Sequence, residues 1–175
     1  MKYIPLLFLM FLVSCSSEPA YLEGATSWSS GNHPVKVKWS ENYRMILPFV
    51  DMEERLLIGI INPESGSSIV VKISQDVPQS EIANKEFYIS NKEIIRHKVP
   101  SVEFLEEGDE KFMGKDFHFI QYKMFNENFK KKMDVNNYIR RDGEHMFSIT
   151  YSYSSEEDLK DIKKILKDLS LWSKK

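Results

Sequence analysis

Hydrophobic residues recur with a period of two along most of the chain beyond residue 34, a pattern typical of strands with one buried face. Segment 35–39, for example, alternates apolar side chains with two lysines. Asp142-Gly143 is a strong signal for a two-residue hairpin between the last two predicted strands. The strands predicted in this way are 35–39, 44–47, 56–61, 69–73, 102–106, 116–125, 131–140 and 144–153.

Two segments have helical spacing instead. Segment 77–98 predicts one imperfect helix, with a break near Ser90 and Asn91. The C-terminal segment begins with Ser154 and Glu157, which form a capping-box pattern. Its apolar stripe favours packing on the sheet, and the alternative is a helix lying on anionic lipid, because lysines flank the stripe. The stripe consists of Leu159, Ile162, Ile165, Leu166, Leu169 and Trp172.

The start of the chain is typical of an export signal. Lys2 supplies a positive charge, and 4–13 is an apolar run. A membrane-spanning helix needs about 20 residues, so this run suits the hydrophobic region of a signal peptide. We therefore expect residues 1–14 to be removed on export.

The residues around the expected cleavage point, Leu12-Val13-Ser14-Cys15, resemble the lipobox of bacterial lipoproteins. The resemblance implies cleavage before Cys15, a diacylglycerol thioether on its sulfur, and a palmitate-type acyl chain on its new amino group. Cys15 is the only cysteine of the chain. The alternative is an ordinary signal peptide with an incidental cysteine.

The resemblance also bears on location. In that family an aspartate directly after the cysteine commonly retains the protein in the inner membrane, whereas this chain has Ser16. We therefore expect a cell-envelope protein anchored in the outer membrane and facing the periplasm, with surface exposure as an alternative. The polar composition of 15–33 predicts a flexible tether that leads to a single domain over 34–175.

The order of the predicted elements is strand pairs, a helix, an antiparallel meander and a closing helix. This α+β arrangement, an antiparallel β-sheet flanked by helices, resembles the PsbP-like α/β/α sandwich family over roughly 34–173. The resemblance rests on 35–48, on Gly114 before the strand at 116–125, on Asp142-Gly143 and on the closing helix. It implies a binding or assembly role, because members of that family act mainly as such subunits.

Composition excludes several classes of protein. Lys and Arg number 24 against 26 Asp and Glu, giving a net charge of −2, so no nucleic acid partner is expected. A single cysteine excludes an intramolecular disulfide and a multi-thiolate zinc site. Eleven Phe, eight Tyr and three Trp can fill a core, which argues against intrinsic disorder.

Candidate chemistry is sparse, and we predict no catalytic residues, metal site or cofactor. His33 and His97 are isolated, and His118 and His145 would share a metal only if their strands were adjacent. Two charged clusters are candidate binding surfaces, although solvent-exposed turns are the favoured interpretation of both. The acidic cluster would bind a basic partner or a cation, and it consists of Glu103, Glu106, Glu107, Asp109 and Glu110. The basic cluster would bind an anionic surface, and it consists of Lys130, Lys131, Lys132, Arg140 and Arg141.

These observations favour a non-enzymatic, lipid-anchored module that binds or assembles with an envelope protein. The alternative is a carrier that holds a small apolar ligand between sheet and helix. Its basis is the aromatic content of Phe117, Phe119, Tyr122 and Phe125, although a strand that is apolar on both faces is more often central in a sheet. A hydrolase with a dispersed site is the least favoured reading, because no nucleophile, phosphate-binding or zinc motif occurs.

Overall fold

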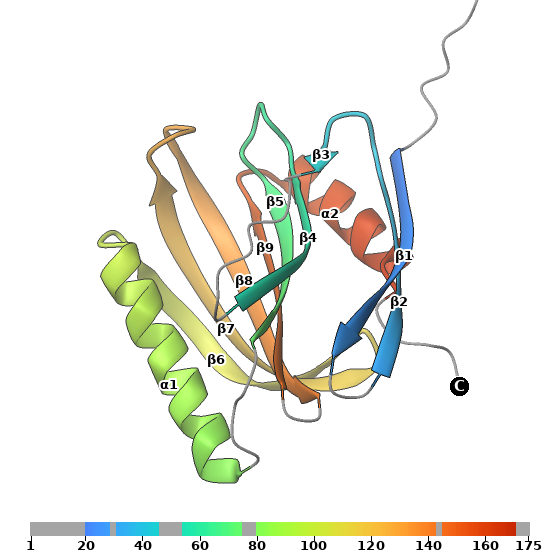
Figure 1. The fold of residues 1–175 in the computed structure, drawn as a ribbon. Helices are drawn as coiled ribbons and strands as arrows, with labels where there is room; N and C mark the ends of the chain where they lie inside the picture. The colour runs from blue at the N-terminus through green and yellow to red at the C-terminus, as the bar shows by residue number, and fades with distance from the viewer. Residues whose placement is uncertain (1–19, 29–30, 46–53, 75–79, 143–144, 171–175) are drawn as a thin grey trace, which may run out of the picture.

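A seven-stranded antiparallel sheet organises the chain, in the order β3-β4-β5-β9-β8-β7-β6 (Figure 1). The computed structural model describes residues 20–28, 31–45, 54–74, 80–142 and 145–170. The strands are β3 (Arg44–Met45), β4 (Glu54–Ile61), β5 (Ser68–Ser74), β6 (Glu103–Phe112), β7 (Lys115–Asn126), β8 (Lys131–Asp142) and β9 (His145–Tyr153). The predicted hairpins β4–β5 and β8–β9 are confirmed, the latter with Asp142 opposite His145.

A layer of structure covers each face of this sheet. Helix α1 (Glu81–Lys98) lies on one face, over β6, β7 and β8 (Figure 1). Helix α2 (Glu156–Asp168) lies on the other face, beside a two-stranded hairpin of β1 (Ala20–Trp28) and β2 (Gly31–Trp39). The expected α+β class, with an antiparallel sheet between helices, is confirmed.

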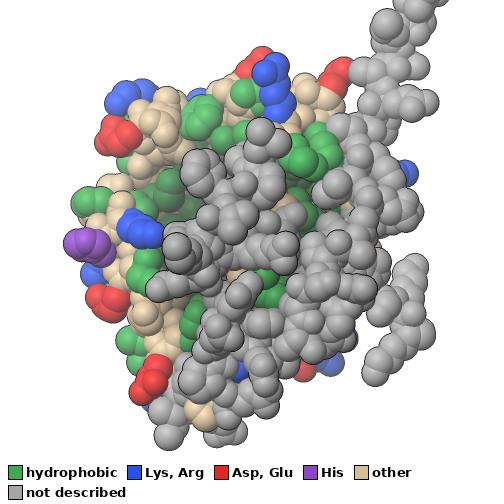
Figure 2. All heavy atoms as spheres, in the orientation of Figure 1, with side chains coloured by type: hydrophobic (Ala, Val, Ile, Leu, Met, Phe, Trp, Pro, Cys, Tyr) green, Lys and Arg blue, Asp and Glu red, His purple; other side chains and the backbone are tan. Residues whose placement is uncertain are grey.

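The core is divided by the sheet into two clusters. On β7, Phe117 and Phe119 face the α2 side, whereas Ile120 and Tyr122 face the α1 side. This strand is apolar on both faces because both faces are covered. Three of the aromatic residues that suggested a ligand carrier, Phe117, Phe119 and Tyr122, thus belong to two separate layers of core, and Phe125 belongs to neither. In the space-filling view, charged side chains of both signs are interspersed with hydrophobic ones over the described part of the visible face (Figure 2).

Helix α2 packs on the sheet as the favoured interpretation predicted. Ile162, Ile165, Leu166 and Leu169 are buried in the same cluster as Phe147 of β9. Trp172, the last residue of the predicted stripe, lies outside the described residues. The helix begins one residue later than the capping pattern suggested, because Ser155 is the N-cap.

Three expectations from the sequence differ from the structure. Residues 20–28, part of the expected tether over 15–33, form β1 and pair along their whole length with β2. The predicted break near Ser90 and Asn91 is absent, since α1 is continuous from Glu81 to Lys98. The acidic stretch lies along β6, an edge strand of the sheet, and not in the solvent-exposed turn that was favoured for it.

Candidate functional site

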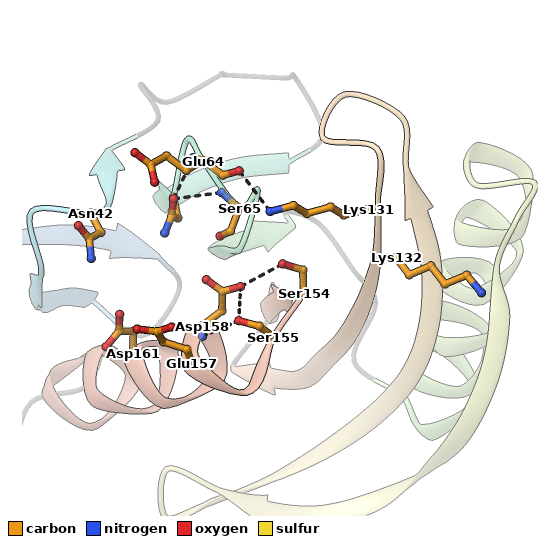
Figure 3. Close-up of a pocket in the computed structure, with 11 residues that line it drawn as sticks. Asn42, Glu64, Ser65, Lys131, Lys132, Ser154, Ser155, Glu157, Asp158 and Asp161 are labelled. Carbon is orange, nitrogen blue, oxygen red and sulfur yellow. Dashed lines mark hydrogen bonds between the residues drawn. The ribbon is translucent and has the colours of Figure 1, made fainter.

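A polar groove with a volume of about 640 Å³ opens at the N-terminus of α2 (Figure 3). Four segments of the chain border it: the segment between β2 and β3, the β4–β5 turn, the start of β8 and the beginning of α2. Charged and polar side chains supply its lining, which is formed by Asn42, Asn62, Glu64, Ser65, Lys131, Lys132, Ser154, Ser155, Glu157, Asp158 and Asp161.

Asp158 is the most constrained side chain of the groove. Its backbone N–H donates to Ser155 Oγ at 3.1 Å, so Ser155 caps the helix. In return the hydroxyl groups of Ser154 and Ser155 donate to Asp158 Oδ2 at 3.0 and 2.9 Å. Burial alone would raise the pKa of Asp158, but the surrounding serine hydroxyl groups, led by Ser155, hold this pKa below its usual value. The carboxylate is therefore held ionised in a fixed position beside the helix N-terminus.

The phenol of Tyr43 lies close to the same carboxylate. Its side chain is buried, and burial together with the nearby Asp158 and Asp161 carboxylates raises the pKa of Tyr43. Tyr43 is therefore a neutral phenol at physiological pH, and it contributes to the core cluster that supports α2. Tyr43 thus packs beneath the groove's fixed carboxylate as part of the core.

Charges of both signs meet across the groove. Lys131 Nζ donates to the backbone carbonyl of Glu64 at 3.4 Å, which links the two turns (Figure 3). Glu157 and Asp161 project from the opposite wall, on α2. Such a surface can bind polar or zwitterionic groups, but it offers no apolar wall to a hydrophobic ligand.

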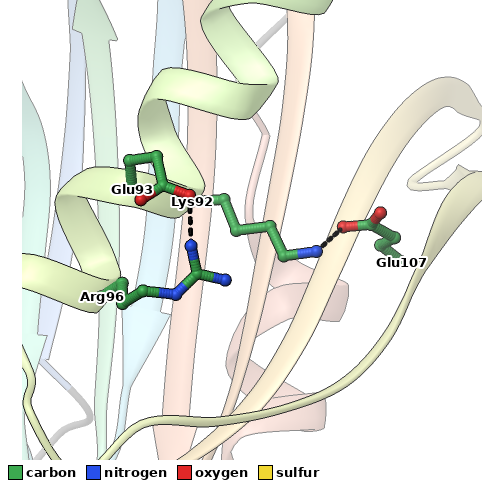
Figure 4. Close-up of polar contacts among 4 residues, drawn as sticks. All are labelled: Lys92, Glu93, Arg96 and Glu107. Atoms are coloured by element: carbon green, nitrogen blue, oxygen red, sulfur yellow. Dashed lines mark hydrogen bonds and ion pairs between the residues drawn. The ribbon is translucent and has the colours of Figure 1, made fainter.

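A second surface, on the outside of the molecule, combines ion pairs with exposed apolar side chains. Lys92 of α1 bonds to Glu107 of β6 at 2.6 Å, and Arg96 pairs with Glu93 one turn away (Figure 4). Three large apolar side chains of the same two elements are about half exposed, and these are Ile89 and Ile94 of α1 and Leu105 of β6. We call the outer side of α1 together with β6 the α1–β6 surface.

Polar contacts fix α1 on the sheet. Arg141 Nε donates to Asn84 Oδ1 at 2.6 Å, and Asn137 Nδ2 donates to Asn91 Oδ1 at 3.0 Å. Thr150 Oγ1 in turn donates to Asn137 Oδ1 at 3.1 Å, so the contact extends to β9. These bonds explain why the helix lacks a clean apolar stripe: several positions of its inner face are amides.

The histidines do not form a shared site. Strand β8 lies between β7, which carries His118, and β9, which carries His145. His118 instead stacks on Tyr88 of α1, with ring centroids 4.1 Å apart, and its Nδ1 lies 3.0 Å from Asp109 Oδ1. His97 is exposed at the end of α1, and the side chains of His33 and His145 are outside the described residues. In the described part of the chain, no group of three or more His, Cys, Asp or Glu could hold a metal ion.

The basic cluster predicted from the sequence is divided in the structure. Lys130, Lys131 and Lys132 are exposed at the β7–β8 turn, where Lys130 pairs with Glu127 at 2.9 Å. Arg140 and Arg141 lie at the far end of β8. The guanidinium of Arg140 lies over the Phe117 ring, 5.6 Å from its centroid.

Sequence reasoning missed the polar groove. A clue was present in the run of two serines and three acidic residues at 154–158, which was read only as a helix start. Cys15, the expected lipidation site, lies outside the described residues. Within the described ranges, no helix is long and apolar enough to cross a membrane.

No protein-family model matches this sequence, and no curated protein matches it either. Among solved structures, the cyanobacterial PsbP protein of Synechocystis superposes with a TM-score of 0.53 at 10% identity, over 92% of this chain and 99% of that one. A Pseudomonas aeruginosa protein of unknown function gives 0.46 at 12% identity, over 83% and 91%. A Bacteroides thetaiotaomicron protein gives 0.44 at 10% identity, over 80% and 46%. The likeness to the Synechocystis protein confirms the expected PsbP-like fold, and at this identity it shows the fold alone.

Proposed function

We propose that this protein is a lipoprotein of the bacterial cell envelope that acts as a non-enzymatic binding or assembly module for a protein partner. The anchor would be Cys15, which follows the lipobox-like Leu12-Val13-Ser14. Multiple acyl chains anchor a protein stably, because each buried methylene contributes about 0.8 kcal/mol. Ser16 in place of aspartate favours the outer membrane, with the domain in the periplasm.

The observation that carries the partner-binding role is the α1–β6 surface. Ile89 and Leu105 expose 54% and 49% of their area, beside the Lys92–Glu107 ion pair. Apolar side chains interspersed with charges are typical of the non-obligate interfaces of proteins. The edge of the sheet at β6 adds backbone groups that can pair with a partner strand.

The carrier alternative receives less support from the structure. A carrier needs a largely apolar cavity of about 300–1,000 Å³. The groove at α2 has a suitable volume, about 640 Å³, but its lining is polar and charged. Between α2 and the sheet, the space where a ligand was expected is occupied by Ile162 and Leu166 packed with Phe147.

The anchor is tested by substituting Cys15→Ala and growing the cells with an alkyne analogue of palmitate. We expect the parent protein to incorporate the label and the variant to remain an unlabelled precursor. Ser16→Ala serves as the matched control, because it leaves the cysteine in place. Label on the Cys15→Ala variant would refute the lipoprotein assignment.

The partner surface is tested by photo-crosslinking in intact cells. A photoreactive amino acid replaces Ile89 or Leu105, and the exposed Lys163 of α2 is the control position. We expect one discrete adduct from the first two positions, absent from the control and abolished by Glu substitution of the neighbouring Ile94 or Ile89. Adducts of equal yield at all three positions would contradict a specific surface.

A further inference from the structure

We propose that the groove end of the domain faces the membrane surface, with the β6–β7 turn pointing away from it. The groove end is defined here as the β4–β5 turn, the β7–β8 turn and the first turn of α2. This orientation rests on the proposed lipidation of Cys15. In this orientation the groove end is an interaction surface, and the layer of lipid headgroups is its partner.

The distance between the anchor and the fold is short. Strand β1 begins at Ala20, so only four residues lie between its first residue and Cys15, and five Cα–Cα steps join the two. An extended chain spans at most about 3.3–3.6 Å per residue, which gives a maximum reach of roughly 17 Å. The start of β1 must therefore remain close to the headgroups once the cysteine is acylated.

The register of β1 places its start at the groove end. Ala20 pairs with Trp39, the last residue of β2. Asn42, three residues further along, lines the groove together with Lys131 of the β7–β8 hairpin. In Figure 1 the N-terminal end of β1 lies at the same end of the molecule as the β4–β5 and β7–β8 turns. The membrane-proximal end of the chain and the groove thus share one end of the fold.

Strand length excludes the inverted orientation. Strand β7 runs from Lys115 to Asn126, and twelve residues at about 3.4 Å each span roughly 40 Å. The nine residues of β1 span roughly 30 Å by the same rise. With the β6–β7 turn against the bilayer, Ala20 would lie about 30 Å or more from the headgroups, which exceeds the reach of the five Cα–Cα steps from Cys15.

The charges at the groove end indicate how the surface makes contact. Lys130 exposes 74% of its side chain but pairs with Glu127, which is equally exposed. Glu64 and Glu157 lie at the same end. Because both signs are present, the contact is held by the acyl anchor and not by attraction to anionic lipid. It should therefore persist at high salt and on vesicles of neutral phosphatidylcholine.

The test uses the full lipidated protein, purified from membranes and reconstituted in neutral phosphatidylcholine vesicles that contain a headgroup-labelled nitroxide lipid. Acylation blocks the only native cysteine, so an introduced cysteine is the single free thiol. A bimane fluorophore is attached at Glu64→Cys on the groove end, or at Lys115→Cys beside the β6–β7 turn. Both positions are exposed, and Lys130→Cys supplies a second groove-end position should Glu64→Cys misfold.

We expect nitroxide quenching at least threefold stronger at position 64 or 130 than at position 115, unchanged in 0.5 M salt. Equal or reversed quenching on a protein whose mass shows acylation would overturn the orientation while leaving the anchor intact. A protein without the acyl mass would overturn both the anchor and the orientation. Quenching lost in salt would refute contact through the anchor.

Discussion

Gly66 in the β4–β5 turn lies against the aromatic ring of Phe129 in the β7–β8 turn. A β-carbon at Gly66 would lie 2.5 Å from Phe129 Cδ2, closer than side-chain carbons approach one another. Gly66 also has a φ of +78°, in the left-handed region that favours glycine. This contact joins the two turns that border the groove, so the groove's shape depends on a residue without a side chain.

Substitution Gly66→Ala should therefore destabilise the protein through both steric overlap and backbone strain. We expect a loss of about 2–4 kcal/mol in the free energy of unfolding. Gly114→Ala is the matched control, because Gly114 has a φ of +75° but nothing within 4 Å of its β-carbon position. The control should lose only the backbone part, about 1–2 kcal/mol. Equal losses in urea unfolding would show that the Phe129 contact is unimportant.

The packing of α2 on the sheet leads to a second prediction, which concerns the stability of two variants of this helix. Leu166 is buried at the interface between the helix and the sheet, so Leu166→Ala should leave a cavity and cost about 2–5 kcal/mol. Lys163, on the exposed side of the same helix, should tolerate substitution by Ala within about 0.5 kcal/mol. Denaturant midpoints measure both. If Leu166→Ala left the midpoint of the parent unchanged, the helix would not be packed in solution.

The ionised Asp158 should make stability depend on pH. Its pKa in the folded protein is below the ordinary value of 3.8, so the folded state binds fewer protons than the unfolded state in this range. The stabilisation that the ionised Asp158 carboxylate provides is thus complete well above pH 3.8, and it is lost as the pH falls through the pKa of Asp158 in the folded protein.

Asp158→Asn should consequently be less stable than the parent at pH 7 and approach it as the pH falls toward 3. The loss at pH 7 should be about 1.5–3 kcal/mol, as for hydrogen bonds to a charged group. Glu157→Gln, one position earlier and exposed, serves as the control. A difference between parent and Asp158→Asn that stayed constant from pH 7 to pH 3 would rule out this role of the carboxylate.

Removal of β1 should weaken the fold. Within the described residues, β2 pairs with β1 and with no other strand, so the removal leaves β2 without a partner. A chain that begins at His33 lacks β1, whereas one that begins at Ala20 retains it. We expect the shorter chain to melt at a lower temperature and to expose the edge of β2 to strand pairing. Circular dichroism melting and light scattering compare the two chains. Identical melting curves would show that the hairpin does not contribute to stability.

The sequence predicted those elements whose pattern is local and strong. Helix α2 combines a serine cap, acidic residues in its first turn and a regular stripe from Ile162 to Leu169, and all three signals agree. The β8–β9 hairpin likewise follows from alternating side chains on either side of Asp142-Gly143. Each of these elements could be predicted because the residues that determine it lie next to one another in the sequence and favour the same local structure.

Other features depended on contacts between distant segments. Strand β1 is built largely from small and polar residues, which are also typical of a linker, and only its pairing with β2 makes it a strand. Helix α1 was predicted as imperfect, with a break near Ser90 and Asn91. In the structure, Asn84 and Asn91 bond to Arg141 and Asn137, which lie about 50 positions later in the chain. The groove is assembled from four separate segments, so no single stretch of sequence could reveal it.

The amide contacts beneath α1 also determine how the molecule opens. The neutral bond between Asn137 and Asn91 contributes a net stabilisation of only about 0.5–1.5 kcal/mol, and the bond from the charged Arg141 to Asn84 contributes about 1.5–3 kcal/mol. Two such bonds position α1, but they secure it less than a continuous apolar stripe would. The amide protons of α1 should accordingly exchange with solvent by an opening that leaves β8 and β9 intact. Each opening uncovers Ile120 and Tyr122 on the sheet beneath. The domain thus holds a concealed apolar surface beneath α1, covered by Phe87, Tyr88 and Ile95.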